Sequence, residues 1–138
     1  MLNILSDKLK VELTSISLLE NVYDFFVIQN EWFPYASFEL NDFDGEYLDS
    51  YENKRFWTFK IAIFQETSKM TRDEAKKSLY DVLEKIIEKF DWNQFLDWLV
   101  NNSKVVKWNL WNYTSDKWWK MLFLDINIQF ETTLKINN

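Results

Sequence analysis

Four acidic side chains gather in the segment 41–55, NDFDGEYLDSYENKR, and carboxylates at this spacing could bind a hard cation such as Ca²⁺. The acids, which surround the only glycine of the chain, are Asp42, Asp44, Glu46 and Asp49. An EF-hand loop needs glycine at its sixth position and glutamate at its twelfth. Counted from Asp42, Gly45 is at position 4 and Asn53 is at position 12. A solvated hairpin, in which Gly45 adopts a turn conformation that other residues disfavour, is therefore preferred over a weak cation site.

The sequence contains few other residues of the types that catalyse reactions in enzymes. Pairs such as Asp42/Asp44 or Glu84/Glu88 could act as a general acid and base, but with 22 acids in 138 residues such pairs are expected by chance. Histidine and cysteine are absent, which removes the commonest general base, zinc ligands and thiolates. Phosphate-binding loops and nucleophile elbows need two or more glycines. We expect a protein that is not an enzyme and has no cofactor or metal centre.

Tryptophan is the other unusual feature, since aromatic residues make up 19% of the chain and eight of them are Trp. Trp118 and Trp119 are neighbours in a predicted strand, so they point to opposite faces and cannot both be buried in one core. Exposed Trp is a common anchor of protein–protein interfaces. Stacking of a sugar or of single-stranded nucleic acid is the alternative, although a net charge of −6 disfavours nucleic acid. Trp111, Trp118 and Trp119 are therefore candidates for subunit contacts.

Periodicity predicts the elements that position these residues. Apolar residues about four apart predict an N-terminal helix over 4–17. Thr71 and Glu74 fit a capping box at the start of a long amphipathic helix that runs to Phe90. An extra helical turn or a short second helix is expected over 91–102. Strands are predicted over 35–40, 56–66, 103–114 and 117–133, with a short strand or loop before Pro34.

The two best strands show how the layers pack. The strand 56–66 is apolar on both faces and should be central, whereas the last strand alternates, with Leu122 to Phe130 packed and the residues between them wet. The predicted fold is α+β: one domain, residues 1–138, with an antiparallel sheet of four to five strands and both helices packed on one face. No run of about 20 apolar residues and no signal peptide is found, so a cytoplasm-like compartment and no membrane contact are expected.

The segment 38–66 resembles the tail-terminator, or tail-completion, proteins of long-tailed bacteriophages. The resemblance lies in an acidic stretch with a tyrosine and an aspartate (FDGEYLD, 43–49), a polar link that ends in Asn53-Lys54-Arg55, and an aromatic strand (WTFKIAIF, 57–64). The order of an N-terminal helix, a long helix after this strand and a closing pair of strands also agrees.

The resemblance implies a structural role. Such proteins form a ring, typically of six subunits, that closes the head-proximal end of the tail tube in the virion, contacts the tube and the neck or head-completion protein, and is made in the host cytoplasm. It implies no catalysis, cofactor or sequence-specific nucleic-acid binding. The acidic segment, with Asp42, Asp44, Glu46, Tyr47 and Asp49, would reach a neighbour. A head-side head–tail joining protein and a cytoplasmic binding module remain the alternatives.

Overall fold

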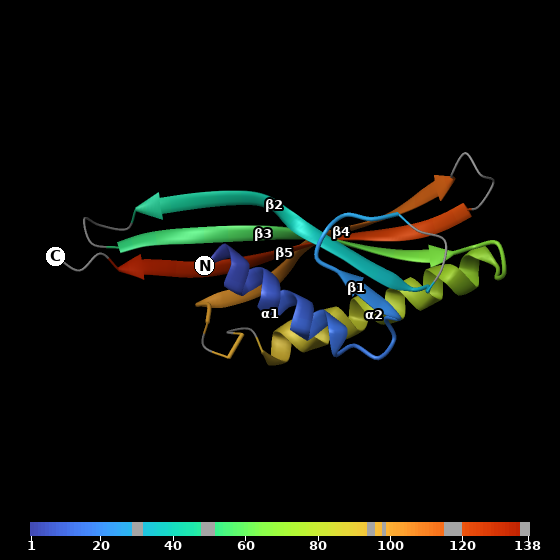
Figure 1. Ribbon diagram of the computed structural model, residues 1–138, viewed down its shortest axis with the longest axis horizontal. Helices are drawn as coiled ribbons and strands as arrows, with labels where there is room; N and C mark the ends of the chain where they lie inside the picture. The colour runs from blue at the N-terminus through green and yellow to red at the C-terminus, as the bar shows by residue number, and fades with distance from the viewer. Residues whose placement is uncertain (29–31, 48–51, 94–95, 98, 115–119, 136–138) are drawn as a thin grey trace.

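The computed structural model describes residues 1–28, 32–47, 52–93, 96–97, 99–114 and 120–135 (Figure 1). The two helices and five strands, in chain order, are α1 (Leu2–Thr14), β1 (Asn21–Tyr23), β2 (Tyr35–Tyr47), β3 (Glu52–Glu66), α2 (Arg72–Trp92), β4 (Asn102–Thr114) and β5 (Lys120–Lys135). The strands form one sheet in the order β1-β2-β3-β5-β4. The expected α+β fold, with an N-terminal helix and a long second helix, is confirmed.

One expectation about the sheet is wrong, because the sheet is mixed. β1 is parallel to β2, while the other neighbouring strands are antiparallel. A parallel neighbour needs a crossover, and its described residues, 24–28 and 32–34, lie on the sheet face opposite the helices (Figure 1). The Ser37 hydroxyl donates to the carbonyl of Phe25 at 2.6 Å and accepts from the Val27 N–H at 3.2 Å. These hydrogen bonds hold the crossover against β2.

The long helix forms where its sequence signals lie. Thr71 is the N-cap of α2, and its hydroxyl oxygen accepts the backbone N–H of Glu74 at 3.2 Å. The buried face of α2 packs on the sheet and consists of Ala75, Leu79, Val82, Leu83, Ile86 and Phe90. The helix ends at Trp92, and the described residues between 93 and 101 form turns. The expected extension past Phe90 therefore amounts to two residues.

The N-terminal helix begins and ends earlier than expected, at Leu2 and Thr14 instead of residues 4 and 17. It buries Leu5, Leu9 and Leu13. The hydroxyls of Thr14 and Ser15 donate to the carbonyls of Lys10 and Glu12, both at 2.6 Å. Such local hydrogen bonds compete with continued helix, which gives a reason for the early end.

The two faces of the sheet differ as predicted. β3 is the central strand, and on the helix side it buries Trp57, Phe59, Ile61 and Ile63. The helix-side residues of β5 are also buried and consist of Leu122, Leu124, Ile126, Ile128 and Phe130. The opposite face, called the open face here, carries half-exposed polar residues between them. At one end of the open face, the crossover covers a small second core of Tyr35, Ala62, Phe64 and Met121.

The sheet is longer than the helix layer. Residues 42–47 of β2, 52–57 of β3 and 130–135 of β5, called the arm here, form the end of the sheet that extends beyond both helices (Figure 1). At the base of the arm, the ring of Phe130 still packs on Phe90 of α2, with ring centroids 6.0 Å apart. At the opposite end, the ends of β4 and β5 turn away from α2 (Figure 1). No helix within the described ranges is long and apolar enough to cross a membrane.

Candidate functional site

The acidic segment is one strand of the arm. Asp42 and Asp44 are exposed on the open face and pair across β2 and β3 with Thr58 and Phe56. Together with Gln129 of β5, these residues line a shallow hollow of about 260 Å³. The two carboxylates bond locally, since Asp42 Oδ1 accepts the N–H of Phe43 and Asp44 Oδ1 accepts the N–H of Gly45, both at 2.9 Å. Strand geometry therefore presents both acids side by side on one surface.

The role expected for Gly45 is wrong. Gly45 lies within β2 opposite Arg55, and its φ is not positive. A Cβ added to it would meet nothing nearer than Asn53 Oδ1 at 3.6 Å, so neither its conformation nor its space requires glycine. β2 and β3 are antiparallel neighbours as expected, and their pairing continues past Gly45 to Tyr47 and Asn53.

Three of the predicted residues of this segment are placed only in part or not at all. The backbones of Glu46 and Tyr47 belong to β2, and their side chains lie outside what the structure describes. Asp49 falls in 48–51, also outside the described residues. Among the described residues, no group of three or more acids is arranged to hold a metal ion.

The two tryptophans of β4 lie on opposite faces of the sheet. Trp108 is 44% exposed on the helix side and contacts the Tyr80 ring of α2, edge to face at 5.7 Å. Trp111 is 51% exposed on the open face, opposite Phe123 of β5. Trp118 and Trp119 lie outside the described residues. The structure thus exposes Trp111 at the border of the sheet, at the other end from the acidic arm.

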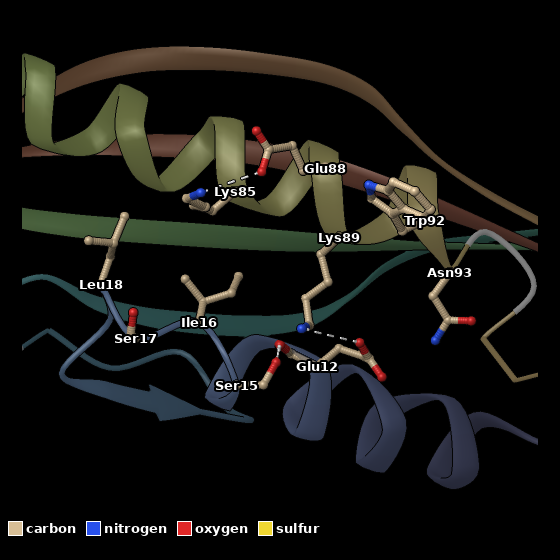
Figure 2. A pocket seen from close by; sticks show the side chains of 10 residues that line it. All are labelled: Glu12, Ser15, Ile16, Ser17, Leu18, Lys85, Glu88, Lys89, Trp92 and Asn93. Atoms are coloured by element: carbon tan, nitrogen blue, oxygen red, sulfur yellow. Dashed lines mark hydrogen bonds and ion pairs between the residues drawn. The ribbon is translucent and has the colours of Figure 1, made fainter.

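A groove between the helices was not predicted. It has a volume of about 620 Å³ and lies between the end of α1 and the last turns of α2 (Figure 2). Ile16 and Leu18 line one side, and Trp92, which is 91% exposed, stands at the end of the other (Figure 2). The sequence contains one signal for this groove, which is that Trp92 lies outside the apolar stripe of α2. The residues of such a stripe form the buried face of a helix, so a Trp outside the stripe is expected to be exposed.

Ion pairs connect the two helices at this groove. Lys89 of α2 lies 3.8 Å from Glu12 of α1 (Figure 2). Lys8 of α1 donates to the carboxylate of Asp97, in the turn after α2, and this hydrogen bond lowers the pKa of Asp97 and raises the pKa of Lys8. These contacts connect α1 to the last turns of α2 and to the turn that follows α2.

Comparison with protein-family models and with curated proteins finds nothing that matches the chain. The case for a function therefore depends on this chain's residues and their geometry. The structure gives two kinds of surface, an extended sheet with acids and Trp on its border strands and a groove beside α2. The first kind includes every predicted site residue that the structure places.

Proposed function

We propose that this protein is a structural subunit of a phage virion, a tail terminator that forms a ring at the head-proximal end of the tail tube and joins it to the neck. The observation that carries the proposal is the length of the sheet. Its strands run 13 to 16 residues in β2, β3, β4 and β5, more than the usual 5 to 6 or so. The arm extends past the helices and is free to contact a neighbour (Figure 1).

The side chains on these strands suit assembly. The arm exposes the ring of Phe43, which packs on Trp57 at 4.6 Å, on the face opposite Asp42 and Asp44. The border strand β4 exposes Trp108 and Trp111. Large aromatic side chains that remain exposed on a folded subunit gain most from burial in a contact. In a ring, two different patches of each subunit meet, which gives both surfaces a use.

The proposed partners are further copies of the chain, the tail-tube protein and a neck or head-completion protein. The proposed location is the tail or neck of the virion, after synthesis in the bacterial cytoplasm. A head-side joining protein would use the same surfaces, and the two roles differ in which neighbour is bound. Binding to isolated tail tubes, as against isolated portal-containing heads, separates them.

The groove beside α2 supports a second candidate function, a binding module for a small ligand. It combines the exposed Trp92 ring with the charged groups of Lys85 and Glu88, which lie 3.5 Å apart (Figure 2). Pockets that bind small molecules combine apolar walls with a few polar groups in this way. This candidate predicts a stable monomer whose Trp fluorescence responds to ligand.

Electron microscopy with matched Trp variants tests the proposal. The purified protein, alone and mixed with tail tubes from a phage whose genome carries this sequence, should form closed rings at one tube end. Trp111→Ala should impair ring formation without changing the circular dichroism spectrum. Trp92→Ala, which alters a still more exposed Trp in the groove, should form rings as the wild type does. A wild type that forms no ring and binds no tube end would refute the terminator function.

A further inference from the structure

Besides the outer side of β1, which has only three residues, two long stretches of sheet edge have no strand neighbour in the described part of the chain. β4 forms one border of the sheet. At the other border, β1 pairs with β2 only at 35–37, so residues 38–47 have no strand on their outer side in the described part of the chain. The backbone N–H and C=O groups of such an edge can pair with a further strand. Each copy therefore offers two edges for strand pairing.

The two edges carry opposite charge. β2 contains four acids and no Lys or Arg, whereas β4 contains Lys104 and Lys107 and no Asp or Glu. The side chains of Glu39, Asp42, Lys104 and Lys107 are all exposed. Within the described ranges, none of the four takes part in an ion pair. These charges are therefore available to a neighbour.

The charges also lie at matching positions along the strands. Two rows of paired residues cross the sheet on the open face, and each ends in an acid on β2 and a lysine on β4: Asp42–Thr58–Gln129–Lys104 and Glu39–Lys60–Asn127–Lys107. A second copy placed beside the first in the same orientation would continue these rows. Asp42 of one copy would then lie next to Lys104 of the other, and Glu39 next to Lys107.

Strand direction and register fit the same arrangement. β2, β3, β5 and β4 alternate in direction, so a repeat in one orientation makes β4 antiparallel to β2 of the next copy. Each edge strand has one extra residue relative to its inner neighbour, between Leu40 and Asp42 in β2 and between Val105 and Lys107 in β4. The two irregularities lie on either side of one row, Leu40–Phe59–Ile128–Val105, so both fall between the row of Asp42 and Lys104 and the row of Glu39 and Lys107. The two outer edges therefore keep equal spacing and match each other.

We propose that residues 38–44 of β2 pair antiparallel with residues 102–108 of β4 in a second copy of this chain, with Glu39 opposite Lys107 and Asp42 opposite Lys104. This inference rests on the proposed function, because it names the contact that closes the ring. β1 of the second copy ends the pairing at Ser37. Each copy gives one edge and accepts the other, which is a heterologous contact, and the twist of the sheet rotates successive copies.

Cysteine pairs test the register directly, because the chain has no cysteine of its own. In one copy, positions 42 and 104 are three strand spacings apart, about 14 Å, too far for a disulfide within the chain. Asp42→Cys combined with Lys104→Cys should therefore give a ladder of linked chains in non-reducing electrophoresis. The control combines Asp42→Cys with Asn109→Cys, which is also on the open face but out of register. No ladder in the first variant, or equal ladders in both, would overturn the proposed pairing.

Charge exchange tests the same contact without cysteine. The double variants Lys104→Glu/Lys107→Glu and Glu39→Lys/Asp42→Lys should each raise the dissociation constant of self-association by at least about tenfold, because like charges then face each other. An equimolar mixture of the two should restore assembly, since each β4 then meets a β2 of opposite charge. Restoration in the mixture also shows that both variants fold. Variants that assemble alone as the wild type does, or a mixture that stays monomeric, would overturn the pairing.

The outcomes separate this contact from the function on which it rests. Light scattering of the wild type and variants reports the contact, and binding to tail tubes reports the function. If the wild type forms rings on tail tubes and the charge-exchange variants assemble as the wild type does, the terminator function stands and the edge pairing is overturned. If the charge-exchange variants assemble only when mixed, and the assemblies bind no tail tube, the edge pairing stands and the terminator function is overturned.

Discussion

Replacement of Thr132 by valine removes the acceptor of a buried hydrogen bond in the arm. The indole N–H of Trp57 on β3 donates to the hydroxyl of Thr132 on β5 at 3.0 Å, and both residues are buried. An unpaired buried donor costs about 1–3 kcal/mol. Valine keeps the branched shape, so we expect Thr132→Val to lower the free energy of unfolding by about that amount. With a urea m-value of about 2 kcal/mol/M, the midpoint should fall by about 0.5–1.5 M.

Urea unfolding followed by circular dichroism measures this loss against two controls. Thr58→Val makes the same exchange beside Trp57 on the open face, where no buried donor depends on the hydroxyl, and its midpoint should barely move. In a Trp57→Phe background, the indole N–H is gone and Thr132→Val should cost little, which gives a coupling energy of about 1 kcal/mol or more. Equal midpoints for the two valine variants, or the same cost of Thr132→Val in both backgrounds, would refute the reasoning.

Three further changes probe the core, the helix start and an ion pair. Leu124→Ala empties a fully buried site on β5 and should cost about 2–5 kcal/mol in thermal or urea unfolding; a loss below about 1 kcal/mol would contradict that burial. Thr71→Ala removes the cap on the Glu74 N–H and should cost about 0.5–2 kcal/mol, whereas Thr71→Ser should be close to neutral. The hydrogen bond from Lys8 lowers the pKa of Asp97. The ionised Asp97 therefore stabilises the folded protein fully above about pH 4, and this stabilisation is lost as the pH falls through the lowered pKa. The free energy of unfolding should therefore fall more steeply with decreasing pH in the wild type than in Asp97→Asn. Equal slopes of this free energy against pH would contradict the Lys8–Asp97 contact.

Local patterns were enough to predict most elements. The alternation in β5 and the apolar residues on both faces of β3 follow from side-chain periods that hold within one strand. The start of α2 at Thr71 follows from a cap that spans four residues. Each of these patterns lies within the helix or strand that it predicts, so the prediction did not depend on contacts with distant residues.

The features that were mispredicted depend on distant residues. β1 pairs parallel with β2, and no local pattern in three residues reveals a parallel neighbour. Gly45 was assigned to a turn by its residue type, yet the ladder to β3 continues past it as far as Tyr47. Pairing with a long partner strand therefore overrode the turn preference of glycine.

The candidate surface shows the same division. The acids of the arm and Trp111 were recognised by residue type and spacing. Lys104 and Lys107 were not, since their meaning depends on the place of β4 at the border of the sheet. That order follows from long-range pairing of β5 between β3 and β4, which residue patterns in either strand do not encode. A charge on a strand becomes informative only once the neighbours of that strand are known.

The charges and irregularities of the two border strands decide between three ways of pairing two copies. Lysines and bulges on edge strands usually prevent association, and here like charges disfavour β4 against β4 and β2 against β2. Neither effect opposes β4 against β2 of another copy, because the charges there are opposite and the extra residue of each strand falls between the same two charged rows. Symmetric dimers are therefore disfavoured by the same residues that permit a head-to-tail contact. A head-to-tail contact gives a closed ring where the rotation between successive copies permits closure, and the proposed role as a tail terminator requires such a ring.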